Sequence, residues 1–311
     1  MLINPNNQTN LYRHDSCFHE LLKLVDDRKF PSKILLSGNK GIGKSTLAYH
    51  IINYSLSQNE SYPYDKENKK INKSNKSFNL IKNYVHPNFY LIDLQNEKKN
   101  IDINQIRQLI AYTNKSTFNG ADRFILIDNI ELLNINSTNA LLKILEEPND
   151  NLYFILINNN KKILPTLNSR CINYKINLTF NESIDVSNRV YGENILDLIN
   201  EELISYYNTP GDFLNLLSFS QENKIDLKIL DLTSFLKTLI DGKFFKKNII
   251  IKNLMFYYME LFFLNKSKTY KNKSNIINNY SYFVEKINNS KYFNLDEESV
   301  FLEFKSKVLN G

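Results

Sequence analysis

The chain has 311 residues and a mass of 36.6 kDa, more than one compact core usually holds, so we expect two or three domains. Hydrophobic residues make up 42% of the sequence and aromatic residues 13%, which is ample for globular cores. The 39 Lys and Arg against 33 Asp and Glu give a net charge of +6. Because Lys and Asn are abundant throughout, we attribute this charge to biased composition rather than to a dedicated DNA-binding face.

Cysteine content and hydropathy limit the setting of the protein. Its two cysteines, Cys17 and Cys171, are too few for a disulfide framework or a cysteine zinc site, and a reducing cytoplasm is the simplest setting. Residues 1–15 have no apolar stretch suited to a signal peptide. The most apolar run, Ile249–Leu264, is short for a membrane span and contains charged residues, so it predicts a buried helix. We expect a soluble, cytoplasmic protein without membrane contact.

The first part of the chain has the pattern of a helix, a strand, a glycine loop and a second helix. Residues 16–30 carry apolar side chains at helical spacing, and residues 33–38, KILLSG, indicate a short buried strand. The glycine loop then leads into residues 44–56, KSTLAYHIINYSL, which are typical of a helix. Strand, glycine loop and helix in this order are the context that a phosphate-binding loop requires.

Residues 59–83 interrupt this pattern. Charged residues and Asn replace the apolar periodicity over the whole segment. We therefore expect an exposed excursion with little core of its own, whose deletion would leave the rest of the domain folded.

Strands and helices alternate between residues 86 and 178. The sequence predicts strands in residues 86–94, 123–130, 151–159 and 171–178, and amphipathic helices in residues 101–118 and 137–148. Ser137 is the expected N-cap of the second helix and Pro148 its expected end. The last strand alternates, which places Ile172, Tyr174 and Ile176 on one face.

This alternation predicts the α/β class, with a parallel sheet and right-handed crossovers in the doubly wound arrangement. After Leu178 the strand signal disappears and only helical patterns remain. We expect an α/β P-loop domain over residues 1–178, a small helical lid over 179–222 and an all-helical C-terminal collar domain for oligomerisation over 223–311.

The stretch from Leu35 to Ile51, LLSGNKGIGKSTLAYHI, satisfies the phosphate-binding pattern G-x-x-x-x-G-K-[ST]. Small residues let backbone N–H groups converge on a phosphate, the lysine adds a charge for the outer phosphates, and the serine hydroxyl can bind Mg²⁺. The pattern predicts a loop able to hold ATP or ADP with Mg²⁺. Its candidate binding residues are Gly38, Gly41, Gly43, Lys44, Ser45 and Thr46.

A carboxylate at the end of an apolar strand is the second requirement for Mg²⁺, and Asp128 supplies it after FILI. An ATPase of this kind needs another carboxylate, usually at the next position, to polarise the attacking water. Here that residue is Asn129, and an amide can orient a water but cannot accept its proton near neutral pH. Glu131 comes where the chain should already have turned away, so we expect a solvated or helix-capping charge and no hydrolysis in this site.

Arg170 precedes the last predicted strand, at the rim of the sheet. As a surface residue it would pair with a local carboxylate, which is the usual role of a lone arginine. As a functional residue it would be an arginine finger, a guanidinium offered to the phosphates in a neighbouring subunit. The residues alone leave both interpretations open.

Several motifs together resemble the AAA+ clamp-loader family. In chain order they are GNKGIGKST, HPN, IDINQIRQL, NALLKILEEP and LPTLNSRC. The similarity is dense from about Leu22 to Leu178 and weak beyond, and NALLKILEEP with SRC is its specific part. Within the family, the chain is most similar to the non-motor subunits of the bacterial DNA polymerase III clamp loader.

The resemblance implies roles that spacing alone does not assign. Ser169, Arg170 and Cys171 match the S-R-C motif whose arginine completes the ATP site of the adjacent motor subunit. Asn158, after the fourth strand, falls near the polar sensor position and joins Asp128 among the implied nucleotide-binding residues.

Two family features are missing. The lid helix of active members carries an arginine that touches nucleotide, and this chain has Gly211 and Asp212 there. Some members carry a four-cysteine zinc module after the first helix, where this chain has residues 59–83 and no cysteine, so we expect no zinc.

We therefore expect a non-motor subunit of a hetero-oligomeric loader, without ATPase activity of its own, that supplies Arg170 in trans. The implied partners are gamma- or tau-type motor subunits, a delta-type subunit, the sliding clamp and primed DNA. Two alternatives stay open: an active AAA+ ATPase, as a motor subunit or a related remodeller, and a P-loop kinase or transferase. Asn129 and Asp212 argue against the first, and the helical C-terminal third fits the second poorly.

Overall fold

Two units of the chain have separate cores in the computed structural model, which describes residues 4–95, 98–114, 120–147, 151–247, 249–269, 273–293 and 295–310. The first unit contains Met1–Val186 with Thr209–Gly211, and the second contains Ser187–Asn208 and Asp212–Gly311. The predicted boundaries at residues 178 and 222 describe a finer, three-part division, which stays a prediction.

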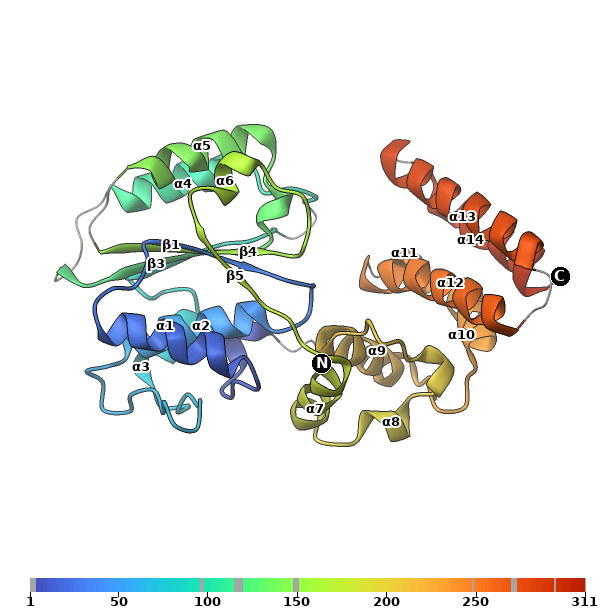
Figure 1. The fold of residues 1–311 in the computed structure, drawn as a ribbon, viewed down its shortest axis with the longest axis horizontal. Helices are drawn as coiled ribbons and strands as arrows, with labels where there is room; N and C mark the ends of the chain where they lie inside the picture. The colour runs from blue at the N-terminus through green and yellow to red at the C-terminus, as the bar shows by residue number, and fades with distance from the viewer. Residues whose placement is uncertain are drawn as a thin grey trace. The chain divides into compact units, whose positions relative to one another are not determined.

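A five-stranded sheet forms the centre of the first unit, with the strand order β2-β3-β4-β1-β5 (Figure 1). All neighbouring strands pair in parallel. The strands are β1 (Lys33–Ser37), β2 (Phe89–Ile92), β3 (Arg123–Ile127), β4 (Leu152–Asn158) and β5 (Ile172–Lys175). The central strands β1, β3 and β4 are buried almost throughout, as their continuous apolar sequences require. The predicted α/β class with a parallel sheet is confirmed.

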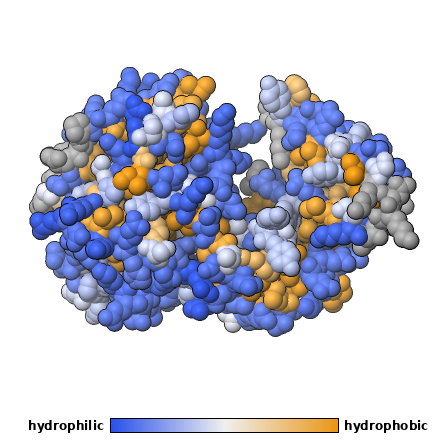
Figure 2. Space-filling model, viewed as in Figure 1, coloured by the Kyte–Doolittle hydropathy of each residue, from blue (hydrophilic) through white to orange (hydrophobic). Residues whose placement is uncertain are grey.

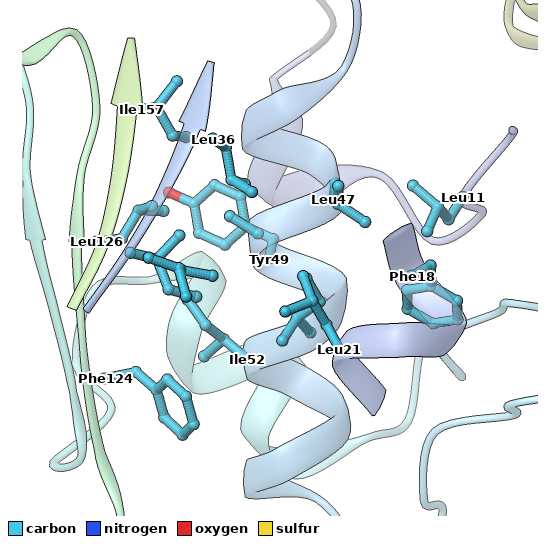
Figure 3. Close-up of a cluster of buried hydrophobic side chains, with 14 of the residues drawn as sticks. Leu11, Phe18, Leu21, Leu36, Leu47, Tyr49, Ile52, Phe124, Leu126 and Ile157 are labelled. Atoms are coloured by element: carbon cyan, nitrogen blue, oxygen red, sulfur yellow. The ribbon is translucent and has the colours of Figure 1, made fainter. Parts of the chain in front are cut away.

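Helices cover both faces of this sheet (Figure 1). One face carries α1 (Asp15–Asp26), α2 (Lys44–Leu56) and α3 (Lys76–Lys82), and the other carries α4 (Ile103–Thr113), α5 (Ile135–Glu146) and α6 (Pro165–Asn168). Between α1, α2 and the sheet lies an apolar core that includes Phe18, Leu47 and Phe124 (Figure 3). A second core lies between the sheet and α4 and α5. The loops that follow the strands meet at the carboxyl edge of the sheet, where ligands bind in folds of this class.

Side-chain caps fix the starts of α4 and α5. Asp102 and Gln105 form a reciprocal capping box at the start of α4. The prediction that Ser137 caps the next helix is wrong, because α5 begins earlier and Asn134 is its N-cap, accepting the Ser137 N–H at 2.8 Å. Pro148, the expected end of this helix, lies outside the described residues.

Residues 59–83 pack onto the first unit, so the prediction of an exposed excursion without a core is wrong. Tyr64, Ile71, Phe78 and Ile81 are buried and belong to the same core as α1 and α2. The apolar residues are few but widely spaced, and each contributes to burial. Deletion of the segment would expose this core.

Polar contacts tie the same segment to α2. The Tyr64 hydroxyl lies 2.7 Å from Nδ1 of the buried His50, and Asn53 Nδ2 donates to Asn75 Oδ1 at 2.9 Å. Asn75 is also the N-cap of α3 and accepts the Phe78 N–H. The segment therefore supports the helix that begins at the glycine loop.

The edge strand β5 is shorter than the sequence predicts. Ile176 is buried and Tyr174 is half-buried, but Ile172 is 53% exposed. Among the strands in the described ranges, β5 pairs with β1 alone and is the edge of the sheet. An edge position explains why the alternation does not produce one evenly buried face.

The second unit is helical. Its helices are α7 (Phe180–Tyr191), which begins in the first unit, α8 (Ile195–Leu198), α9 (Pro210–Asn223), α10 (Leu232–Asp241), α11 (Phe244–Lys247), α12 (Ile249–Thr269), α13 (Lys273–Phe293) and α14 (Glu297–Phe304), which continues as a π-helical turn over Lys305–Leu309. Short 3-10 helices lie in both units: Pro5–Asn7 and Ile130–Leu132 in the first, and Glu201–Leu203 in the second.

α12 is the buried helix predicted for the most apolar run of the sequence. Met255, Tyr258 and Met259 are at most 1% exposed, and Phe263 packs against Phe283 of α13. None of the helices in the described ranges has the length and the apolar character needed to cross a membrane. Hydrophobic residues also reach the surface, as patches among hydrophilic ones (Figure 2).

Candidate nucleotide-binding site

The glycine loop joins β1 to α2 at the carboxyl edge of the sheet. Gly41 and Gly43 have φ angles of 86° and 93°, in the left-handed region that residues with a Cβ rarely adopt. Gly43 is the N-cap of α2 and offers no side-chain cap, so the first N–H groups of the helix are left for other acceptors. Gly38 is buried and Thr46 is half-buried in the first turn. The loop has the local geometry of a phosphate site.

Lys44 is only 3% exposed, and three acceptors surround its ammonium. Nζ donates to the carbonyl oxygens of Gly38 at 2.9 Å and Asn39 at 2.6 Å, and to Oδ1 of Asn159 at 2.9 Å. Burial lowers the pKa of Lys44 to about 8, partly offset by nearby carboxylates, so the ammonium is still mostly charged at neutral pH. An ammonium has three N–H bonds, and these contacts use all of them.

Ser45 and Asp128 meet beside the loop. Ser45 Oγ donates to Asp128 Oδ2 at 2.6 Å. Burial, reinforced by the neighbouring Asp93 carboxylate, raises the pKa of Asp128 to about 6. A hydroxyl and a carboxylate that converge on one point are ligands that Mg²⁺ uses beside bound phosphates, so this pair fits a nucleotide-associated Mg²⁺.

Asn129 follows Asp128, at the position where an ATPase of this kind usually carries a second carboxylate. Its backbone N–H donates to Asp128 Oδ1 at 2.8 Å, and its Nδ2 donates to Asp93 Oδ1 at 2.7 Å. Its Oδ1 accepts from Asn159 Nδ2 at 2.8 Å. The amide is therefore bonded on both sides, and it carries no group that can accept a proton from water near neutral pH.

Glu131 also reaches this cluster, so the prediction of a solvated or helix-capping charge is wrong. Its Oε1 accepts from Asn159 Nδ2 at 2.8 Å, and its Oε2 accepts from the Asn159 backbone N–H at 3.3 Å. The 3-10 turn over Ile130–Leu132 keeps Glu131 at the carboxyl edge instead of carrying it away. The carboxylate is engaged by Asn159.

The two asparagines after β4 point to different partners. Asn158, which the family resemblance places near the sensor position, has its Nδ2 bonded to the Lys161 carbonyl at 2.9 Å and its Oδ1 bonded to the Lys161 N–H at 3.1 Å. Asn159, which the sequence analysis missed, is the residue that contacts Lys44. In a strand, successive side chains alternate sides, so a shift of one residue exchanges the two roles.

Two other segments hold the glycine loop from outside. His14 Nε2 donates to the Ile42 carbonyl at 2.7 Å, and burial lowers the pKa of His14. Gly211, within the first unit, donates its N–H to the Gly41 carbonyl at 3.0 Å. A Cβ on Gly211 would lie 2.7 Å from Gly41 Cα, so only glycine permits this approach. Gly211, one of the two residues predicted to stand in place of a lid arginine, is therefore in backbone contact with the glycine loop.

Arg170 lies between α6 and β5. Its Nη1 donates to the Thr166 carbonyl at 2.7 Å, and its Nη2 pairs with Glu146 at the end of α5. The side chain is 32% exposed, and that of Glu146 is 55% exposed. The local carboxylate expected for a surface arginine is present, and the guanidinium also remains accessible. Within the S-R-C motif, Ser169 donates to Thr166 and Cys171 is half-buried.

Metal ligands other than the Ser45 and Asp128 pair do not gather in the parts of the chain that the structure describes. No group of three or more His, Cys, Asp or Glu side chains there is placed to hold an ion. The expected absence of zinc stays a prediction.

Residues 13–179, more than half of the chain, match the protein family described as DNA polymerase III, delta subunit. The chain is 30% identical over 231 residues to the DNA polymerase III subunit delta' of Buchnera aphidicola subsp. Baizongia pistaciae, which covers 66% of each protein. It is 31% identical over 139 residues to the subunit delta' of Pseudomonas aeruginosa, or 44% of this chain and 40% of that protein.

A subunit gamma is similar as well. The chain is 34% identical over 209 residues to DNA polymerase III subunit gamma of Buchnera aphidicola subsp. Schizaphis graminum, which covers 62% of this chain and 53% of that protein. The matched regions thus span 40% to 66% of the lengths of these three relatives. Among solved structures, a gamma subunit-related protein of Thermotoga maritima is similar at 22% identity with a TM-score of 0.45, over 71% of this chain and 66% of that one.

Proposed function

The chain belongs to the DNA polymerase III delta-subunit family, with delta' subunits among its relatives, and on this premise we propose that it is a non-motor subunit of the clamp loader. In this role it supplies Arg170 in trans to the ATP site of an adjacent motor subunit, while the assembly places the sliding clamp on primed DNA. Its own nucleotide site does not turn over ATP, and it works in the cytoplasm.

The observation that carries this proposal is the contrast between Asn129 and Arg170. Asn129 stands where hydrolysis needs a base, and its amide is committed to Asp93 and Asn159. Arg170 keeps a partly exposed guanidinium at the rim, where an exposed carboxylate and one carbonyl are its partners among the described residues. A planar guanidinium suits the oxygens of a transferring phosphoryl group.

The chain's own site supports nucleotide binding rather than nucleotide turnover. Gly38, Gly41, Gly43 and Thr46 shape the loop around Lys44. The pair formed by Ser45 Oγ and Asp128 would hold Mg²⁺ with ATP or ADP, and the ion would neutralise phosphate charge there. Magnesium-dependent hydrolysis by the isolated wild-type chain that is lost in Lys44→Ala would instead support an active ATPase.

The C-terminal helices support an assembly role. Large apolar or aromatic side chains are exposed along α13, α14 and the turn between them: Ile277, Tyr280, Tyr282, Tyr292, Phe293, Leu295 and Leu302. Exposed apolar residues grouped on neighbouring helices are typical of protein interfaces. We propose that this collar contacts the gamma- or tau-type and delta-type subunits, with the rim around Arg170 as the second contact.

Clamp loading by the reconstituted assembly tests the proposal. Arg170→Ala should leave the subunit folded and able to join the assembly, because a partly exposed arginine contributes little to its own domain. At the ATP site that it completes, hydrolysis should fall on the order of a thousandfold. Bulk hydrolysis should fall less than clamp loading, since the other ATP sites of the loader are unchanged.

The matched control is Arg28→Ala, which removes another exposed arginine of the same unit. It should load clamps at the wild-type rate, and gel filtration should show the same assembly for both variants. Normal loading by an intact Arg170→Ala assembly would show that Arg170 is only a surface residue paired with Glu146.

A further inference from the structure

Among the described residues Lys44 has three acceptors, and of these only Asn159 comes from outside the glycine loop. The carbonyl oxygens of Gly38 and Asn39 belong to the loop itself, six and five residues before the lysine. Asn159 is 115 residues away in sequence and arrives from the end of β4. The two loop carbonyls can stay in place when a ligand enters the loop, whereas the side chain of Asn159 occupies the remaining N–H of the ammonium.

The orientation of the Asn159 carboxamide is fixed by its neighbours. Nδ2 donates to Asn129 Oδ1 and to Glu131 Oε1, both at 2.8 Å, and the backbone N–H donates to Glu131 Oε2 at 3.3 Å. A reversed amide would place its oxygen against two acceptors and its NH₂ group against the ammonium. Only the observed orientation satisfies every group, so Oδ1 faces Lys44.

Asn129 is suited to this arrangement in a way that a carboxylate is not. It donates to Asp93 and accepts from Asn159, so it uses both ends of its amide. A Glu at this position would bring a second negative charge beside Asp93 and near Asp128. Asn129 therefore has a structural role as well as lacking a base.

A nucleotide bound in this loop presents its outer phosphates to the lysine. Because all three N–H bonds of Lys44 are used, a phosphate oxygen can bind only by displacing an acceptor, and Asn159 is the one that is not part of the loop. We propose that the Asn159 carboxamide, held by Asn129 and Glu131, occupies the position of a nucleotide phosphate at Lys44 and so weakens binding of nucleoside di- and triphosphates. This inference does not depend on the role of Arg170.

Calorimetric titration of the full chain with ADP and Mg²⁺ tests the proposal. Asn159→Ala frees one N–H of Lys44, so ADP should bind about twofold to tenfold more tightly than to wild type, the equivalent of one net hydrogen bond. In a Lys44→Ala background, Asn159→Ala should bring no gain, because its effect acts through the lysine.

Two further variants separate this effect from a general loosening of the site. Asn158→Ala removes the neighbouring carboxamide, which bonds to Lys161 and not to Lys44, and should leave ADP affinity unchanged. Glu131→Gln keeps the size of the side chain but weakens its hold on Asn159, and should raise affinity in the same direction by a smaller factor. If circular dichroism shows that Asn159→Ala does not fold, Glu131→Gln tests the proposal in its place.

Weaker ADP binding by Asn159→Ala would overturn the proposal, because it would mean that the carboxamide donates to the phosphate. Equal affinity of wild type and Asn159→Ala, including no detectable binding by either, would overturn it as well. An equal gain from Asn158→Ala would show that the Lys44 contact is not the cause.

Discussion

Lys44 and Arg170 are both cations suited to phosphate, but the protein uses their bonding capacity very differently. Lys44 is 3% exposed, and all three of its N–H bonds are taken by acceptors within the same chain. Arg170 has a side chain that is 32% exposed, and two contacts hold a guanidinium that has five N–H donors. A complete phosphate-binding motif therefore does not by itself mean that its lysine is available.

The surroundings of the two cations favour opposite uses. An exposed ion pair such as that of Arg170 with Glu146 contributes about 0–1 kcal/mol. It orients the guanidinium, while the N–H donors that it does not use stay available to a partner phosphate. The buried contacts of Lys44 are harder to exchange, because a buried donor left without an acceptor costs about 1–3 kcal/mol. The structure thus favours a closed site inside the chain and an available arginine at its rim.

The largest effect on ATP hydrolysis should come from replacing Arg170 with lysine, the residue type found at position 44. Arg170→Lys keeps the charge but loses the planar fork, so hydrolysis at the partner's ATP site should remain lower than wild type by about a hundredfold or more. Single-turnover hydrolysis by the reconstituted assembly measures this. A rate within a few-fold of wild type would mean that charge alone suffices.

The position of Lys44 also depends on α2, which begins at this residue and packs against residues 59–83. Tyr64→Ala removes a buried ring that also bonds to His50, so urea unfolding should show a loss of about 3–4 kcal/mol. The control is Tyr62→Ala, since Tyr62 is 52% exposed and its removal should cost less than about 0.5 kcal/mol. Equal stability of the two variants would mean that residues 59–83 contribute little to the core, as their composition suggests.

The same support should depend on pH. Burial lowers the pKa of His50 from 6.5 to about 4, so between these values the unfolded chain binds more protons than the folded one. The stabilisation is complete above pH 6.5 and is lost as the pH falls toward 4, by about 3 kcal/mol at most. His50→Gln should flatten this dependence between about pH 7 and pH 5. An unchanged slope in the variant would assign the effect to other groups.

The smallest effect should come from the carboxylate that holds Arg170. Glu146→Gln leaves the guanidinium less well oriented, so hydrolysis at the partner's site should fall by about twofold to fivefold, the size expected for one exposed ion pair. In an Arg170→Ala background the same change should have no effect. Glu147→Gln, at the exposed neighbouring position, is the control. A loss that persists without Arg170 would indicate a structural role for Glu146.

The sequence predicts the central strands and the glycine loop correctly because both rest on strong local patterns. Continuous apolar runs gave the central strands, and the glycine spacing gave the loop between β1 and α2. The position of Arg170 near the rim followed from its place just before the last strand. These patterns are repeated over several residues, so one atypical position does not obscure them.

The features that sequence did not predict depend on single residues. Asn158 and Asn159 are adjacent and chemically identical, so only the register of β4 decides which one reaches Lys44. Asn134 and Ser137 are both good caps, and the backbone decides between them. In residues 59–83, four buried apolar side chains are diluted among Lys and Asn, so average composition hides their packing.

The most direct test replaces Lys44 and Arg170 one at a time in the same reconstituted assembly and measures ATP hydrolysis with clamp and primed DNA. Lys44→Ala in this subunit should leave the rate at its wild-type value, because in the proposed role its own site does not turn over ATP. Arg170→Ala should lower the rate by the share that one motor site contributes, because in the proposed role Arg170 completes that site. A rate that is lost in Lys44→Ala and retained in Arg170→Ala would contradict the proposal that this subunit acts through Arg170 and not through its own site.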